Sequence, residues 1–224
     1  MKDDKRLYGK YTEQEVIDYL NKNYAENSRI GLVNKQTKGF FKLLFDNMEA
    51  EIINLMEKGC SVLDWGCGAG IGTHMLTEKF QNSTSTGLDI CSVAIDSATK
   101  EFPKSTFITG KIQKTYDIII TSNCLEHFVD YESIYKNLLT HTNKYLVILV
   151  PYKGRITNKI SDHMATLDEN SFKTIVNDFK IINKLRVHGG KYDMCWNNYQ
   201  LLVTYKKKIK TDNAIRVHCG KILS

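Results

Sequence analysis

Glycines at every second position follow a short apolar segment and could form a ligand-binding turn. The segment reads VLDWGCGAGIGT over residues 62–73, with Gly66, Gly68, Gly70 and Gly72 in alternate places. Glycine lets the backbone turn tightly and approach a ligand closely, and free amides at the start of a helix favour an anionic group. The pattern therefore predicts a strand, a tight turn and a helix that together contact part of a ligand.

A carboxylate follows at the end of the next apolar segment. Asp89 lies nineteen residues after Gly70, in the sequence GLDI. A carboxylate at this place can accept two hydrogen bonds from the vicinal hydroxyls of a ribose. The dinucleotide fingerprint G-x-G-x-x-G is absent, because its third glycine position falls on Ile71 or Thr73, and the phosphate loop G-x-x-x-x-G-K-[ST] is absent as well. These residues predict an adenosine-type cofactor with a carboxylate instead of a pyrophosphate, and S-adenosylmethionine fits that description.

Short apolar segments that must position these residues alternate with helical ones. The apolar segments cover 61–66, 85–90, 105–110, 116–122 and 144–150, and helical patterns lie near 72–80, 92–102 and 130–140. Strands that are apolar throughout and separated by helices are typical of a parallel sheet covered on both faces. Two strand-like segments, 180–189 and 197–207, could pair antiparallel. The sequence thus predicts an α/β fold with about seven strands, mostly parallel.

Further helices are predicted outside this alternation. Thr12 and Glu15 have the spacing of a capping box, and residues 40–57 predict one or two helices after a polar stretch. Thr166 and Glu169 predict a capped helix, whose inner face would carry Phe172, Ile175, Val176 and Phe179. We divide the chain into an N-terminal helical lid (1–58), a core (59–207) and a basic C-terminal tail (208–224).

Three motifs together resemble a known enzyme family. LDWGCGAG, GLDI and YDIIITSNCLEH resemble the class I S-adenosylmethionine-dependent methyltransferases, in particular a small-molecule branch with a LEH motif after the fourth strand. The resemblance covers roughly residues 60–152. It implies a Rossmann-like seven-stranded sheet, mostly parallel with an antiparallel last strand, helices on both faces and an N-terminal helical lid. It also implies S-adenosylmethionine as cofactor, S-adenosylhomocysteine as product and no metal.

The same resemblance implies which residues hold the cofactor. The turn from Asp64 to Gly70 would contact it, with Asp89 on the ribose and Ile90 against the adenine. Lys111 stands where members often carry an acidic residue for the adenine amino group, so backbone groups of Gly110 or Ile112 would serve there. The expected cofactor residues are Asp64, Gly66, Cys67, Gly68, Ala69, Gly70, Asp89, Ile90, Gly110, Lys111, Ile112, Ser122 and Asn123.

Two histidines are candidates for catalysis. Methyl transfer is an in-line displacement that depends on placing the acceptor, and a hydroxyl acceptor benefits from a base. His127 follows the fourth strand, where open α/β sheets bind ligands, and His163 lies in a long polar loop after the fifth strand. The alternative for each is a structural role. Tyr152, Lys153 and Arg155 could hold an anionic acceptor, or could simply be solvated.

Cysteine usage and hydropathy exclude other classes of protein. The six cysteines lie far apart without a C-x-x-C pair, which indicates reduced thiols in a cytoplasmic protein and no zinc or iron–sulfur site. No segment approaches the roughly 20 apolar residues that cross a bilayer. The start, MKDDKRLYGK, lacks the apolar region of a signal peptide. We therefore expect no membrane partner.

The net charge of +6 is concentrated at one end of the chain. Residues 206–224 hold six basic side chains and one acid, which leaves +1 for the remaining residues. A short lysine cluster at a chain end is usually solvated, so a nucleic-acid partner is not expected.

These observations favour a methyltransferase for a small polar acceptor. We favour a hydroxyl, as in O-methylation of a sugar or of a nucleotide-linked or phosphorylated sugar. Methylation of the exocyclic amines of nucleic-acid bases is disfavoured. Enzymes with that activity usually resemble one another in a [DN]-P-P-[YF] segment after the fourth strand, and here that segment reads SNCL. The alternatives are an amine or RNA acceptor, with the lysine tail as anchor, and a cofactor-binding module without catalysis. The sequence leaves the acceptor and the oligomeric state open.

Overall fold

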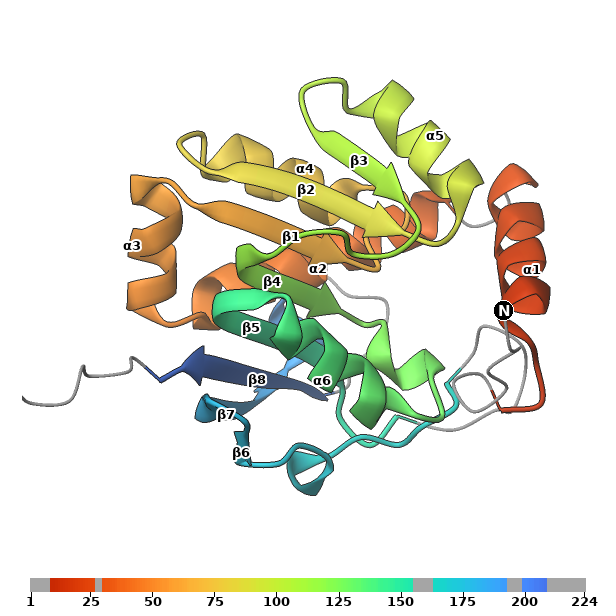
Figure 1. Cartoon of the computed structure of the whole chain (residues 1–224). Helices are drawn as coiled ribbons and strands as arrows, with labels where there is room; N and C mark the ends of the chain where they lie inside the picture. The colour runs from red at the N-terminus through yellow and green to blue at the C-terminus, as the bar shows by residue number, and fades with distance from the viewer. Residues whose placement is uncertain (1–8, 27–29, 155–162, 193–198, 209–224) are drawn as a thin grey trace, which may run out of the picture.

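A single twisted sheet forms the centre of the molecule (Figure 1). The computed structural model describes residues 9–26, 30–154, 163–192 and 199–208. Within them, eight strands lie in the order β3-β2-β1-β4-β5-β8-β7-β6. Their bounds are β1 Ser61–Trp65, β2 Thr84–Asp89, β3 Thr106–Thr109, β4 Tyr116–Ser122, β5 Thr142–Pro151, β6 Ile175–Val176, β7 Phe179–His188 and β8 Tyr199–Lys207. Strands β1 to β5 pair in parallel, and β8 lies antiparallel between β5 and β7. The predicted fold is confirmed, with the two-residue β6 in addition.

Apolar side chains cover both faces of the central strands. Neighbouring residues of a strand point to opposite faces, so Ile118 belongs to one core cluster and Ile119 to the other. Val147 and Leu146 of β5 divide in the same way. Both faces are therefore buried, which explains why the parallel strands are apolar throughout instead of alternating with polar residues.

Six α-helices of the described chain pack around this sheet. They are α1 Glu13–Ala25, α2 Ile30–Asn47, α3 Ala50–Lys58, α4 Ile71–Lys79, α5 Ser92–Glu101 and α6 Tyr131–Thr140, with 3₁₀ turns η1 Leu125–His127, η2 Glu169–Ser171 and η3 Gly189–Tyr192. None of the helices in these ranges combines the length and apolar character needed to cross a membrane. The gap between β3 and β4 contains no helix, since only residues 110–115 separate the two strands.

The N-terminal helices differ in what they cover. In α1 the predicted capping box is confirmed, since the Glu15 amide donates to Thr12 Oγ1 (3.2 Å) and the Thr12 amide to Glu15 Oε2 (2.7 Å). Helix α2 begins at Ile30, ten residues earlier than predicted, because a helix anchored in the core at Phe40 and Phe41 continues into the polar stretch. Figure 1 shows α1 standing beyond the carboxyl ends of β2 and β3, where the predicted lid would lie.

The predicted helix after Thr166 is wrong. Only the turn η2 forms there, and residues 175–179 make a hairpin in which Val176 pairs with Phe179. Asn177 has a positive φ of 52°, which asparagine tolerates in a two-residue hairpin turn. Phe172, Val176 and Phe179 are buried in one cluster as predicted, but Ile175, predicted on the same inner face, is 53% exposed. Strand β7 pairs along its length with β8, and this pairing overrides the helical spacing.

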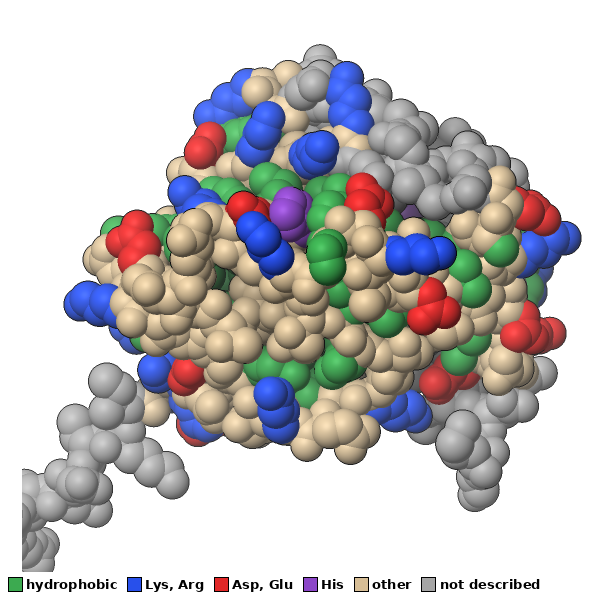
Figure 2. Space-filling model, turned by 90° about the horizontal axis from the view of Figure 1, so that it is seen from above, with side chains coloured by type: hydrophobic (Ala, Val, Ile, Leu, Met, Phe, Trp, Pro, Cys, Tyr) green, Lys and Arg blue, Asp and Glu red, His purple; other side chains and the backbone are tan. Residues whose placement is uncertain are grey.

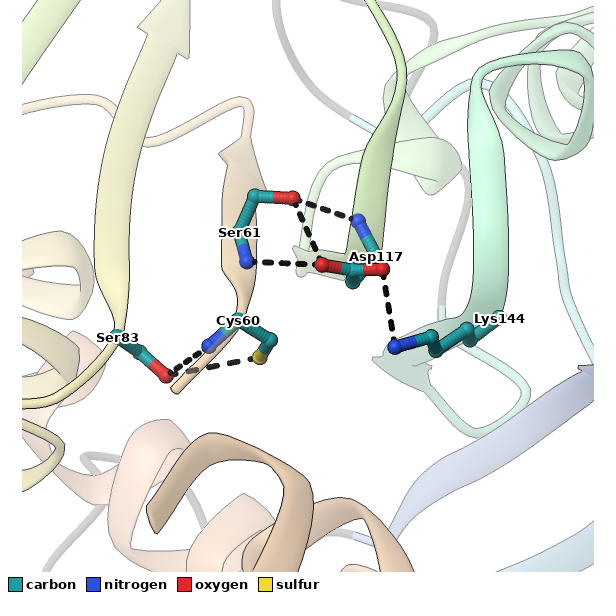
Figure 3. A network of polar contacts seen from close by, with 5 residues as sticks. All are labelled: Cys60, Ser61, Ser83, Asp117 and Lys144. Carbon is teal, nitrogen blue, oxygen red and sulfur yellow. Dashed lines mark hydrogen bonds and ion pairs between the residues drawn. The ribbon is translucent and has the colours of Figure 1, made fainter. Parts of the chain in front are cut away.

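Polar contacts join the amino ends of three strands (Figure 3). Asp117 Oδ2 of β4 accepts hydrogen bonds from the Ser61 amide (3.1 Å) and hydroxyl (3.2 Å) of β1. Its Oδ1 lies 3.2 Å from Lys144 Nζ of β5. These contacts hold β1, β4 and β5 in register, so that their carboxyl ends meet at the opposite rim.

Candidate functional site

A cavity of about 540 Å³ lies at the carboxyl rim of the sheet. This volume is in the usual range for small-molecule sites. Its walls come from the glycine turn, the loops after β2, β3 and β4, and helices α1 and α6. The residues that line it are Glu13, Val16, Leu20, Tyr24, Trp65, Gly66, Gly68, Leu88, Asp89, Ile90, Gly110, Lys111, Ile112, Asn123, Cys124, His127, Phe128, Ile134, Asn137, Leu138, His141 and Met164.

The turn requires glycine at two positions, because neither the backbone conformation nor the surrounding space allows a side chain. Gly66 has φ +77° and Gly68 φ +50°, a left-handed region that other residues rarely adopt. A Cβ on Gly66 would lie 2.4 Å from Cys124 Sγ, and one on Gly68 would lie 2.7 Å from the hydroxyl of Tyr24. The turn is therefore closely packed by the loop after β4 on one side and by α1 on the other.

Most amides of this turn already donate within the protein. Those of Gly66 and Cys67 donate to the Leu88 carbonyl, and that of Gly70 donates to the Cys67 carbonyl. The Gly68 amide donates to Asp89 Oδ2 (2.8 Å). Four of the five amides from Gly66 to Gly70 are thus engaged, which leaves the turn itself with few donors for a ligand.

Asp89 connects the turn to the loop after β2. Its Oδ1 accepts the Cys91 amide (2.9 Å), while Oδ2 accepts the Gly68 amide. Burial raises the pKa of Asp89, and these backbone hydrogen bonds oppose the rise. A carboxylate oxygen has two lone pairs, so each oxygen can accept one further hydrogen bond from a ligand in the cavity.

Asp64 supports the turn without lining the cavity. Its side chain is buried, and Oδ2 accepts a hydrogen bond from the Thr73 hydroxyl of α4 at 2.7 Å. Burial raises the pKa of Asp64 to about 7. Four other expected cofactor residues also lie outside the cavity wall, namely Cys67, Ala69, Gly70 and Ser122.

Asn123 presents a polar atom that has no protein partner in the described structure. Its φ of +50° is a strained value at the end of β4, held by the hydrogen bond from its amide to the Leu149 carbonyl (2.7 Å). The side-chain Nδ2 donates to Ser122 Oγ, whereas the buried Oδ1 accepts no hydrogen bond from the described residues. Since an unsatisfied buried acceptor is costly, this oxygen suits a donor group on a ligand.

The structure brings the two candidate histidines together. His127 lines the cavity, and its ring lies 5.6 Å, centroid to centroid, from that of His163 in an edge-to-face arrangement. The Met164 and Ala165 amides donate to the Glu126 carbonyl at 2.7 and 3.0 Å, which draws this segment against η1. The contact between the two rings could not be predicted from their separation in the chain.

A buried carboxyl group lies behind His127. Glu126 is only 2% exposed, and its Oε1 lies 4.0 Å from His127 Nε2, which is longer than a hydrogen bond. Burial raises the pKa of Glu126 to about 8. At neutral pH this carboxyl group is therefore predominantly protonated.

Two of the expected acceptor residues after β5, Tyr152 and Lys153, lie outside the cavity wall. Tyr152 stacks on Arg186, whose guanidinium carbon is 5.0 Å from the Tyr152 ring centroid and 5.1 Å from that of Tyr199. Lys153 Nζ lies 5.4 Å from the same Tyr152 ring. Arg155 and the basic tail from residue 209 lie outside the described residues.

Several cavity residues were missed by the sequence analysis. They come from α1 (Glu13, Val16, Leu20, Tyr24), from α6 and the residue that follows it (Ile134, Asn137, Leu138, His141), and from Trp65, Leu88, Cys124, Phe128 and Met164. The sequence predicted both helices, but an amphipathic pattern shows which face is buried and not against which element.

Charged side chains and potential metal ligands do not form clusters among the described residues. Lys206 and Lys207, part of the C-terminal lysine cluster, belong to β8 and pair with Glu51 (2.6 Å) and Asp178 (3.6 Å). On the face seen in Figure 2, basic and acidic side chains are interspersed. Among the described residues, no three His, Cys, Asp or Glu side chains gather in a way that could hold a metal ion.

Comparison with known proteins identifies related sequences. A family model described as "Methyltransferase domain" matches residues 56–211. A curated relative, trans-aconitate 2-methyltransferase of Deinococcus radiodurans, is 26% identical over 122 residues, which are 53% of this chain and 47% of that protein. The chain thus spans about half the length of the curated relative it matches.

Solved structures share the fold. Magnesium protoporphyrin IX methyltransferase from Synechocystis PCC 6803, with bound S-adenosylhomocysteine, is similar with a TM-score of 0.66 and 16% identity over 88% of this chain and 100% of its own. A putative methyltransferase of Haloferax volcanii, in complex with a methyltransferase activator, is similar with a TM-score of 0.65 and 12% identity, over 85% and 98% of the two chains.

Proposed function

Because this chain belongs to the methyltransferase-domain family of class I, S-adenosylmethionine-dependent enzymes, we propose that it transfers a methyl group to a hydroxyl of a small polar acceptor. A sugar, or a nucleotide-linked or phosphorylated sugar, is the acceptor class we favour. The observation that carries the proposal is the rim cavity, whose wall includes both the glycine turn with Asp89 and the histidine after β4.

The residues after β2 and β4 suit the adenosyl donor. Asp89 retains lone pairs for two ribose hydroxyls, and Ile90 offers an apolar surface for the adenine. The orphaned Asn123 Oδ1 suits the ammonium group of the donor's amino-acid part. When bound, S-adenosylmethionine supplies an electrophilic methyl group on a sulfonium.

The histidine after β4 supports acceptance by oxygen. A hydroxyl loses its proton as it attacks, and a base that removes the proton typically contributes about 10²–10⁴-fold. His127 lines the cavity with one-third of its side chain exposed, so a ring nitrogen can reach an acceptor there. His163, packed against this ring, would orient it or serve as the second candidate base.

Two measurements test the proposal. Isothermal titration with S-adenosylhomocysteine should give one binding event per chain, and absence of binding would contradict the donor site. Radiolabelled S-adenosylmethionine is then incubated with sugars and sugar phosphates, with small amines and with total RNA in parallel. Label transferred to the hydroxyl compounds supports O-methylation; transfer to amines or RNA alone would refute the acceptor class, and binding without any transfer would indicate a module without catalysis.

A further inference from the structure

Helix α1 is attached to the rim of the cavity at both ends. Near its carboxyl end, Asn21 Oδ1 accepts from the Cys91 thiol (3.2 Å), the Ser92 hydroxyl (3.4 Å) and the Val93 amide (3.3 Å). Residue 91 makes no side-chain cap of its own, so Asn21 serves as the cap of α5 from another helix. At the other end of α1, Glu13 Oε1 lies 4.0 Å from Lys111 Nζ.

This attachment places Tyr24 one turn beyond Asn21, inside the cavity. Its hydroxyl lies 2.7 Å from the position that a Cβ on Gly68 would take. It also interacts electrostatically with Asp89. Burial and the neighbouring Asp89 raise the pKa of Tyr24, so the phenol keeps its proton. Among the described residues no hydrogen bond is made by this hydroxyl, which is a donor available to a ligand.

The cavity offers hydrogen-bond acceptors for some groups of S-adenosylmethionine but few hydrogen-bond donors for its carboxylate. Ribose hydroxyls and an ammonium group are hydrogen-bond donors, and Asp89 and Asn123 Oδ1 are acceptors for them. The α-carboxylate of the amino-acid part needs donors, yet four of the five amides in the turn are engaged elsewhere. The nearby lysine, Lys111, already faces Glu13.

We propose that the Tyr24 hydroxyl donates a hydrogen bond to the α-carboxylate of the methyl donor, so that α1 recognises its amino-acid part. This assignment rests on the proposed function and adds a binding residue to the donor site. It predicts that Tyr24 distinguishes ligands with the amino-acid part from ligands without it.

The test compares two ligands by calorimetry on the full-length protein. S-Adenosylhomocysteine carries the carboxylate, whereas 5′-methylthioadenosine keeps the adenosine and sulfur but lacks the amino-acid part. A hydrogen bond to a charged group makes about a tenfold difference in affinity, so Tyr24→Phe should raise the Kd of S-adenosylhomocysteine by about tenfold. The Kd of 5′-methylthioadenosine should change by less than about twofold, since the adenosine contacts are kept.

Tyr19→Phe is the matched control, because Tyr19 lies on the same helix and does not line the cavity. It should leave both affinities unchanged. Equal weakening of both ligands by Tyr24→Phe, or no weakening of either, overturns the assignment while leaving the donor site intact. Failure of the unsubstituted protein to bind S-adenosylhomocysteine would instead overturn the proposed function together with this assignment.

Discussion

The hydroxyl of Tyr24 occupies the space that a side chain on Gly68 would fill. The two residues are 44 positions apart in the sequence, and their contact joins α1 to the turn between β1 and α4. A Cβ at Gly68 would come within 2.7 Å of that hydroxyl. The absence of a side chain at Gly68 therefore serves both the backbone of the turn and the closing of the cavity by α1.

We expect Gly68→Ala to destabilise the protein. A left-handed conformation costs a non-glycine residue about 1–2 kcal/mol, which corresponds to about 2–8 °C in Tm for a domain of this size. Adding Tyr24→Phe should recover part of the loss, because it removes the atom nearest to the new Cβ.

Gly110→Ala provides the matched control for this pair of substitutions. Gly110 also has a positive φ (+109°), but nothing lies within 4 Å of its Cβ position. Tyr24→Phe should give no recovery in that background. Equal recovery in both backgrounds, measured by thermal unfolding, would show that contact between residues 24 and 68 is unimportant.

Asp89→Ala should weaken donor binding. Charge-assisted hydrogen bonds to ribose hydroxyls are worth about 1.5–3 kcal/mol, so we expect the Kd of S-adenosylhomocysteine to rise by more than about tenfold. Asp96→Ala, on the exposed side of α5, is the control. An unchanged Kd by calorimetry would remove Asp89 from the donor site.

Substitution of the paired histidines should separate binding from turnover. His127→Ala and His163→Ala should leave the Kd of S-adenosylhomocysteine nearly unchanged, while at least one lowers kcat by about a hundredfold because a base is lost. His188→Ala, at the exposed end of β7, should have no effect on kcat. Full activity of both variants with the identified acceptor would exclude histidine from the mechanism.

The buried Glu126 should make stability depend on pH. Burial raises its pKa from 4.5 to about 8, so between these values the folded protein binds more protons at this group than the unfolded chain does. The free energy of unfolding contributed by Glu126 therefore falls as pH rises through this window.

Glu126→Gln removes this titration, and the fall in Tm between pH 5.5 and 8.5 should become smaller. Asp64 contributes in the same direction up to about pH 7 and is retained, so some dependence should persist. Glu57→Gln, exposed on α3, should behave like the unsubstituted protein. Identical pH dependence in Glu126→Gln would mean that this carboxyl group ionises normally in the folded state.

Local patterns in the sequence were sufficient for the sheet and for part of the cavity wall. Ile118 and Ile119 are neighbours that must both be buried, and only a strand covered on two faces allows this. Gly66 and Gly68 were predicted from the spacing of glycines within one turn, and Asp89 from its place at the end of the next strand.

The tertiary structure alone decided the hairpin at residues 175–179 and the contacts of the site between distant segments. The spacing of Phe172, Val176 and Phe179 suits a helix as well as a hairpin, and pairing of β7 with β8 selected the hairpin. The approach of Tyr24 to Gly68, and of His163 to His127, depends on how separate elements pack. The local sequence pattern indicates which face of a helix or strand is buried. The element that packs on this face depends on the packing of the whole chain.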